Sequence, residues 1–358
     1  MAANVLHPEK IDFLRKGTVI PAHPLALTEQ LTIDESRQRL LTRYYIASGV
    51  GGVAVGVHTT QFEIRKPEYN MLERVLELAA DEVQKAQLNR PFLKVAGVVG
   101  PTAQAVREAE LAVQYGYDLG LVSMAGLTDL SEQEVIGHIR TIADIIPVFG
   151  FYLQTTIGGR AFSYDFWKEF MEIPNVQAVK VAAFNRYQTL DVVRALCFSS
   201  RAHEVALYTG NDDNIVADLL TPYRFEAGGQ TVEKRFVGGL LGHWAAWTQK
   251  AVELFGEIKA CVNNNYQDID TLLQRNIEVT DMNAAIFDPS HRFHGCIPGI
   301  HEVLRRQGIL RGLWTLNPEE KLSEGQLEEI DRVIEAYPHL VDDAFVKEWL
   351  ATEQSLVS

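Results

Sequence analysis

The chain has 358 residues, of which 47% are hydrophobic and 22% charged, a composition typical of a globular protein with a large core. Its formal net charge of −14 argues against nucleic acid or an anionic membrane as a partner, because both are bound through basic surfaces. The three cysteines, Cys197, Cys261 and Cys296, form no CxxC pair and so predict neither a disulfide framework nor a zinc knuckle.

Eight short apolar runs recur along the first 245 residues. They are TVIPAHP (18–24), GGVAVGV (51–57), FLKVAGVV (92–99), LGLVSMA (119–125), PVFGFYLQ (147–154), VQAVKVAA (176–183), VALYTGND (205–212) and RFVGGLLG (235–242). Most lack polar–apolar alternation, which is typical of strands covered on both faces. Amphipathic helical segments separate them. Such a repeat predicts a closed (β/α)8 barrel, with a doubly wound open sheet as the alternative.

Beyond residue 245 the pattern becomes helical. We expect residues 1–245 to form the barrel and residues 246–358 to form a helical extension packed on it, as a single structural unit. The tail after Pro318 is charged and amphipathic, so we expect it to pack on the body or on a neighbouring subunit. The first residues lack the apolar core of a signal peptide, and no run reaches the ~20 apolar residues of a membrane span, so we expect a cytoplasmic protein.

Lys180 stands near the end of an otherwise apolar strand, VQAVKVAA. In a (β/α)8 barrel the chemistry lies at the carboxyl ends of the strands. Burial there lowers the pKa of a lysine, and the uncharged amine can add to a ketone to form an imine, an electron sink for breaking or making carbon–carbon bonds. The alternative is a lysine that reaches solvent from a strand end or pairs with a carboxylate.

Tyr152 ends the preceding strand 28 residues before Lys180, one strand–helix–strand repeat earlier. We therefore expect both side chains to project at the mouth of the barrel, side by side. A phenol in that place relays protons during carbinolamine formation and stabilises the developing alkoxide. The alternative for Tyr152 is a core aromatic residue.

The segment from Phe149 to Asn185, with IPNVQAVK ending at Lys180, resembles the dihydrodipicolinate synthase/N-acetylneuraminate lyase family. Members of that family carry a Tyr-Asn-x-Pro strand end, followed by a stretch like IPNIIGIK that bears the imine-forming lysine. The strand end LYTGND resembles the family's SGxD through Gly210 and Asp212. The resemblance covers roughly residues 15–310, and PAHPL and the segment around residues 47–63 match more loosely.

The resemblance implies a (β/α)8 barrel with C-terminal helices and a class I lyase or aldolase that acts on a 2-oxo acid such as pyruvate or a keto sugar acid. It implies Lys180 and Tyr152 as catalytic residues, no metal and no cofactor, and a homo-oligomer, a dimer or a tetramer. Gly210 and Asp212 would lie at the substrate. A dehydratase reaction fits the same chemistry.

Departures from the family pattern concern the rest of the substrate site. Where members bind the substrate carboxylate through paired hydroxyls, this chain aligns Val57 and His58, with Thr59 and Thr60 displaced by two residues. We expect His58, or these threonines brought back by a local bulge, to bind the carboxylate. Arg160 is the nearest candidate for a distal carboxylate, because Ile157 stands where synthases have an arginine.

The tyrosine that synthases lend across a dimer would fall near Ala125, and none is present there. We therefore expect a divergent member rather than a true dihydrodipicolinate synthase. Two rival hypotheses stay open. One is a metal-dependent barrel enzyme that uses His58, Asp212 and the His291–Cys296 segment, and the other is a catalytically degenerate barrel that only binds a keto acid.

Overall fold

The structure is a computed structural model that describes residues 5–357. Its contacts divide the chain into two compact units. The first comprises residues up to Thr18 together with residues 89–240, and the second comprises residues 19–88 and those from Leu241 onward. A division after residue 245, which the sequence indicates, stays a prediction.

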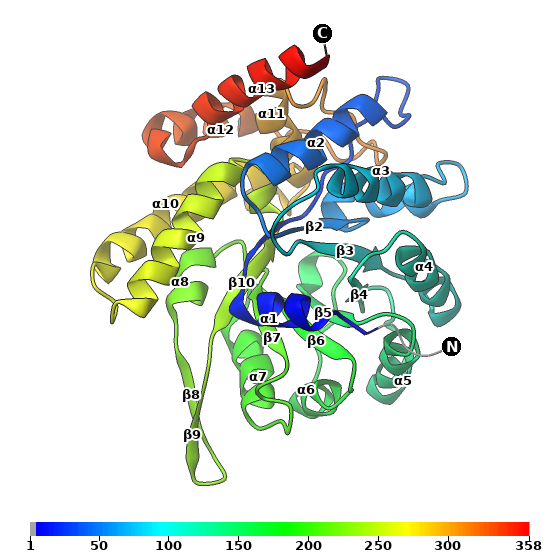
Figure 1. Cartoon of the computed structure of the whole chain (residues 1–358), viewed down its shortest axis with the longest axis vertical. Coiled ribbons are helices and arrows are strands. Elements are labelled where there is room, and N and C mark those ends of the chain that lie inside the picture. The colour runs from blue at the N-terminus through cyan, green and yellow to red at the C-terminus, as the bar shows by residue number, and fades with distance from the viewer. Residues whose placement is uncertain (1–4, 358) are drawn as a thin grey trace. The chain divides into compact units, whose positions relative to one another are not determined.

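The first unit alternates strands with helices and carries one hairpin (Figure 1). Its helices are α1 (Pro8–Lys16), α4 (Thr102–Gln114), α5 (Glu132–Ala143), α6 (Tyr164–Met171), α7 (Arg186–Cys197) and α8 (Ile215–Leu220). Its strands are β3 (Leu93–Val98), β4 (Leu119–Ser123), β5 (Val148–Leu153), β6 (Val176–Ala182), β7 (Ala206–Thr209), β8 (Tyr223–Ala227), β9 (Gln230–Lys234) and β10 (Phe236–Leu241), the last of which ends at the boundary with the second unit.

The second unit is mainly helical. Its strands are β1 (Val19–Pro21) and β2 (Gly52–Val55), and its helices are α2 (Glu35–Ala47), α3 (Leu72–Lys85), α9 (Thr248–Asn263), α10 (Ile269–Phe287), α11 (Cys296–Arg306), α12 (Gln326–Ala336) and α13 (Asp343–Val357). Short 3-10 helices connect elements in both units: η1 (His58–Thr60), η2 (Phe62–Arg65), η3 (Thr155–Ile157), η4 (His243–Ala245), η5 (Pro289–His291) and η6 (Pro338–Leu340).

All eight predicted strands are present and form one parallel sheet, in the order β1-β10-β7-β6-β5-β4-β3-β2. The two strands at the ends of this order, β1 and β2, also pair with each other. The amide of Gly51 donates to the carbonyl of Val19 at 3.1 Å, and the amide of His23 donates to the carbonyl of Ala54 at 2.8 Å. The sheet therefore closes into the expected (β/α)8 barrel, and the open-sheet alternative is wrong.

Side-chain alternation on β5 separates the interior of the barrel from its helical layer. A Cβ at Gly150 would meet the ring of Phe170 on α6, whereas Phe149 packs edge-on against Tyr208 of β7 with ring centroids 5.1 Å apart. Even-numbered residues of β5 therefore face α6, and odd-numbered residues face the interior.

The tail after Pro318 packs on its own unit, as one of the two expected arrangements requires. Arg332 of α12 forms an ion pair with Asp281 of α10 at 2.8 Å, and the hydroxyl of Tyr44 on α2 donates to Asp342 at 2.7 Å. Among residues 5–357, no helix combines the length and apolar character needed to cross a membrane.

Candidate active site

Lys180 lies on β6 with its side chain 8% exposed. Its Nζ atom lies 4.3 Å from the centroid of the Phe151 ring, on the interior face of the neighbouring strand. Burial lowers the pKa of Lys180 from 10.5 to about 8, although the negative charge of Asp212 opposes the change. About one in ten of these amines is then uncharged at neutral pH, against far fewer than one in a hundred for an exposed lysine. The predicted nucleophile therefore has the environment that its chemistry needs.

Gly210 directly follows β7 and lies against the side chain of Lys180. A Cβ atom there would lie 2.5 Å from Cε and 2.9 Å from Cγ of Lys180, closer than side-chain atoms approach one another. It would also lie 2.9 Å from Cβ of Ala182. The small residues at 182 and 210 thus leave room for the extended lysine, a role for Gly210 that the sequence did not reveal.

Asp212 lies two residues past Gly210, is 5% exposed, and donates its amide to the carbonyl of Gly210 at 3.1 Å. The loop that carries it is fixed by the fully buried carboxylate of Asp218 on α8. That carboxylate forms an ion pair with Arg186 and accepts hydrogen bonds from Thr209, Asn211 and Asn214 at 2.7, 2.9 and 3.1 Å. This polar network orders the loop after β7, and the charge of Asp212 in that loop acts on Lys180.

The structure does not pair Tyr152 with Lys180, which differs from the side-by-side arrangement that the sequence indicates, and the catalytic role of Tyr152 stays a prediction. Its neighbour on β6 is Val181, whose side chain faces the helical layer, and its ring packs against Trp167 of α6 with centroids 4.9 Å apart. Its hydroxyl is buried and has no hydrogen bond of normal geometry in the described chain. Burial raises the pKa of this phenol, with a partly opposing effect from the backbone of Phe162.

A register shift between β5 and β6 explains this difference. Val148 pairs with Val176, but the next residue, Phe149, pairs with Ala178, so Gln177 is an extra residue in β6. Without this bulge, the 28-residue spacing would have placed Tyr152 opposite Lys180. With it, Phe151 takes that place. No periodicity in the sequence marks a single-residue bulge.

Arg160 follows η3 and holds a neighbouring loop. Its Nη1 donates to the carbonyls of Leu127 and Leu130 at 3.0 and 2.6 Å, and its guanidinium lies 5.2 Å from the centroid of the Phe162 ring. These contacts join the Arg160 guanidinium to the segment between β4 and α5. Its proposed role toward a distal carboxylate stays a prediction.

His58, Thr59 and Thr60 form η1 in the second unit, directly after β2. The hydroxyl of Thr60 donates to the carbonyl of His23 at 2.7 Å and accepts from the amides of Gly56 and Val57 at 3.0 and 3.2 Å. The hydroxyl of Thr59 donates to the same carbonyl at 3.2 Å. Both hydroxyls are therefore engaged in joining the ends of β1 and β2, which favours His58 over the threonines as the carboxylate donor.

The residues from which the sequence suggested a metal site, His58, Asp212 and the His291–Cys296 segment, form no cluster of metal ligands among the described residues. His291 interacts with Asp288 at 2.6 Å, at the turn between α10 and α11. Across the part of the chain that the structure describes, no group of three or more His, Cys, Asp or Glu side chains is placed to hold a metal ion.

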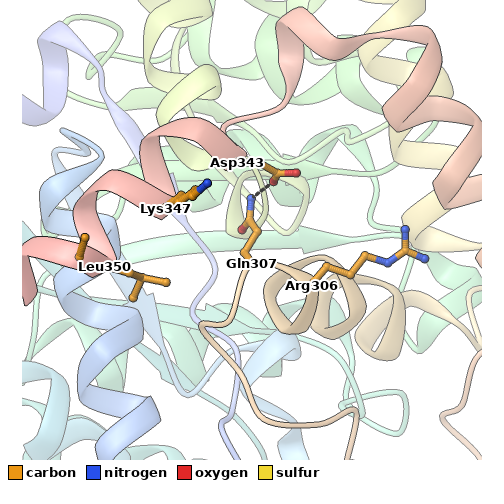
Figure 2. A pocket seen from close by; sticks show the side chains of 6 residues that line it. Arg306, Gln307, Asp343, Lys347 and Leu350 are labelled. Carbon is orange, nitrogen blue, oxygen red and sulfur yellow. Dashed lines mark hydrogen bonds between the residues drawn. The ribbon is translucent and has the colours of Figure 1, made fainter. Parts of the chain in front are cut away.

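A pocket of about 400 Å³ opens in the second unit, between the end of α11 and α13. Figure 2 shows the hydrogen bond across it, from Gln307 to Asp343 at 2.7 Å. Arg306, Lys347 and Leu350 also line it, and none of the residues singled out in the sequence does.

Curated relatives align with part of the chain. It is 27% identical over 206 residues to an N-acetylneuraminate lyase of Citrobacter koseri, an alignment that covers 56% of this chain and 65% of the relative. It is 27% identical over 201 residues to a 4-hydroxy-tetrahydrodipicolinate synthase of Bifidobacterium longum, which covers 55% and 60%. The matched regions span a little under two thirds of these relatives. No protein-family model matches the chain.

Solved structures match nearly the whole chain. A dihydrodipicolinate synthase from Oceanobacillus iheyensis has a TM-score of 0.71 at 16% identity, covering 92% of this chain and 99% of the other. An N-acetylneuraminate lyase from Fusobacterium nucleatum, complexed with pyruvate, has a TM-score of 0.69 at 20% identity, covering 90% and 97%. At these identities the likeness shows a shared fold.

Proposed function

Because this chain is a divergent member of the dihydrodipicolinate synthase/N-acetylneuraminate lyase family, we propose that it is a lyase or aldolase that forms a Schiff base between Lys180 and a 2-oxo acid. The observation that carries the proposal is the buried amine of Lys180 in the barrel interior, with its pKa lowered to about 8. Pyruvate is the simplest substrate to try, because a fold relative has been solved with it.

The proposed reaction begins when the uncharged Nζ of Lys180 adds to the keto carbon. The nitrogen gives up a proton and the oxygen gains one, and a further proton from solvent lets the carbinolamine lose water and leave an iminium ion. In a longer 2-oxo acid with a hydroxyl on its fourth carbon, that hydroxyl gives up its proton as the bond between the third and fourth carbons breaks. The iminium accepts the electron pair of that bond, so that an aldehyde leaves and an enamine remains. Protonation of the enamine and hydrolysis then release the shorter 2-oxo acid. In the reverse direction the same steps join the two molecules.

We assign the proton transfers to Asp212 rather than to Tyr152, which pairs with Val181 and packs against Trp167 of α6. Asp212 is buried, its charge acts on Lys180, and the network around Asp218 fixes the loop that carries it. A carboxylate beside the amine accepts the proton released on addition and returns it to the departing hydroxyl.

Borohydride trapping tests the proposal. Incubation with pyruvate followed by reduction should fix one adduct per chain, on Lys180, and Lys180→Ala should abolish both the adduct and turnover. Lys180→Arg should fail equally, since a guanidinium stays protonated.

Lys94 is the matched control within the chain. Burial also lowers its pKa, but its Nζ lies on the helical side of β3 and donates to the carbonyl of Tyr115 at 3.1 Å. We expect it to stay unlabelled. An adduct on Lys94, or activity retained by Lys180→Ala, would contradict the assignment.

A second candidate function, a barrel that binds a keto acid without turning it over, is favoured by one observation. The interior residue opposite Lys180 is Phe151, which offers no proton. Trapping of Lys180 with no turnover across a panel of 2-oxo acids and aldehydes would support the binding protein over the enzyme.

A further inference from the structure

The hairpin formed by β8 and β9 is inserted between α8 and the last barrel strand, β10, and belongs to neither the strands nor the helices of the barrel (Figure 1). Within its own unit it contacts α7, and Phe225 of β8 lies against Phe198, the residue that follows this helix, with ring centroids 6.4 Å apart. Phe198 is nevertheless 48% exposed. An isolated two-stranded ribbon is at best marginally stable in water, so a ribbon with an exposed aromatic flank favours a further partner.

The turn geometry fixes which backbone groups of β8 point outward. Gly228 and Gly229 have φ values of 59° and 80°, the positive values of a two-residue type I′ turn. The flanking residues 227 and 230 then form a hydrogen-bonded pair, as does Phe225 with Val232 two positions further on. The amides and carbonyls of Arg224 and Glu226 therefore face away from β9, at an edge that no strand among residues 5–357 covers.

The charges on this edge favour a second copy of the same strand. In an antiparallel pairing of β8 with itself about a two-fold axis at Phe225, Arg224 stands opposite Glu226 of the second copy, and Glu226 stands opposite its Arg224. In each of these two pairs the outward amide and carbonyl of Arg224 form hydrogen bonds with those of Glu226 in the other copy. Pairings centred on Arg224 or on Glu226 would instead place like charges opposite one another.

The outer edge of β9 is less suited to such pairing. Its outward residues are Thr231 and Glu233, which pair with Glu226 and Arg224 inside the hairpin. A two-fold pairing about Val232 would place Thr231 opposite Glu233 and form no ion pair. The aromatic face supports the same choice of β8, because the two-fold axis at Phe225 would bring together Phe198 and Phe225 of both copies in one row.

We propose that this chain associates with a second copy of itself by antiparallel pairing of β8, which creates a four-stranded sheet β9-β8-β8-β9 across the two-fold axis. The inference is independent of the proposed chemistry at Lys180. The inserted hairpin is then the dimer interface, and the alternating charges of its edge strand β8 set the register of the pairing.

Proline substitutions test the pairing. Glu226→Pro removes only an outward amide, so the hairpin's own ladder stays intact. We expect the molar mass from light scattering to fall to half that of the unchanged protein at the same concentration. Thr231→Pro, directly opposite on β9, also removes an outward amide and should leave the mass unchanged. An unchanged protein that is monomeric at micromolar concentration, or a Glu226→Pro variant of unchanged mass, would overturn the proposal.

Cross-linking tests it without relying on how the proline variants fold. In the proposed pair the two Phe225 residues face each other at about 4.5 Å between Cα atoms, within the range of about 4.4–6.8 Å that a disulfide spans. Phe225→Cys should therefore give a disulfide-linked dimer under mild oxidation, and Val232→Cys, on the outer strand β9 of the proposed sheet, should not. The three native cysteines are buried and should not contribute. Failure of Phe225→Cys to cross-link would overturn the pairing.

Charge exchange adds a test of register. Arg224→Glu alone should give monomers, because the introduced glutamate would then face Glu226 of the second copy. Glu226→Arg alone should also give monomers, because two arginines would then face each other. An equimolar mixture should associate again, because each chain then meets its complement. A mixture that stays dissociated would contradict this register.

Discussion

The side chain of Lys180 crosses Gly210 so closely that a Cβ atom there would lie 2.5 Å from its Cε. We predict that Gly210→Ala displaces the amine and lowers the rate of imine formation by at least tenfold, with a smaller effect on stability. Rates of borohydride-trapped adduct formation measure this. Gly137→Ala is the control, because no atom lies within 4 Å of a Cβ at that helical position. Equal trapping by Gly210→Ala and the unchanged protein would contradict the role of Gly210.

The pKa of Lys180, about 8, predicts how the reaction depends on pH. Only the uncharged amine adds to a ketone, so the rate of imine formation should rise with pH and level off above about pH 8. The charge of Asp212 holds this pKa up, and Asp212→Asn should therefore move the midpoint to lower pH while it slows proton transfer. Asp213→Asn is the control and should leave the midpoint unchanged. A midpoint near 10.5 would mean that Lys180 is not buried in solution.

The position of Tyr152 predicts an unusual result for the loss of its hydroxyl. Tyr152→Phe should leave imine formation within about twofold, because the phenol faces α6 and not Lys180. It should not lower the melting temperature either, since the buried hydroxyl has no hydrogen bond of normal geometry. A loss of about 10²–10⁴-fold, the usual worth of a positioned proton donor, would instead restore Tyr152 to the active site. Phe151→Tyr is the complementary variant, because it places a phenol on the interior face.

The pattern of eight apolar runs was sufficient to predict the barrel, because strands buried on both faces are apolar along their whole length. Lys180 could be predicted for the same reason, since a lysine in such a run is conspicuous. Two features could not be found in this way. The bulge at Gln177 depends on how β6 pairs with β5, and Gly210 gains its role from a side chain 30 residues away in the sequence.

The β8–β9 hairpin was missed although its signal is present. PYRFEAGGQTVEKR alternates polar and apolar residues about a Gly-Gly pair, the usual mark of a two-residue hairpin loop. The pattern of apolar runs does not include this segment, because its residues are too polar for a strand covered on both faces.

The hydrogen bonds of η1 predict separate effects for its residues. His58→Ala should weaken 2-oxo-acid binding by roughly 1.5–3 kcal/mol if it binds the carboxylate by a charge-assisted bond, measurable by calorimetry. Thr60→Val should instead lower the free energy of unfolding by about 1–3 kcal/mol, because the amides of Gly56 and Val57 lose their acceptor. An unchanged dissociation constant in His58→Ala would assign the carboxylate to backbone amides.

Three buried histidines of the second unit, His23, His243 and His301, predict sensitivity to acid. Burial lowers the pKa of each from 6.5 to about 4. Between these values the unfolded chain binds more protons than the folded one, so stability should fall as pH drops from 6.5 toward 4, by at most roughly 3 kcal/mol for each histidine. Above pH 6.5 these groups should have no effect. His301→Leu should reduce the decline measured by urea unfolding, and a stability that is constant from pH 6.5 to 4.5 would contradict the prediction.

The extra residue at Gln177 has a consequence for how such barrels diverge. If Gln177 paired with Phe149 instead of lying outside the ladder, the carboxyl-terminal half of β6 would slide by one position along β5, and Tyr152 would replace Phe151 opposite the lysine. The amino acids of the two strands would be unchanged. The register of β6 against β5 therefore decides which side chain lies opposite the amine. A sequence alignment that matches Tyr152 to the tyrosine of a relative would therefore count a phenol opposite the lysine, whereas the folded chain places the ring of Phe151 there.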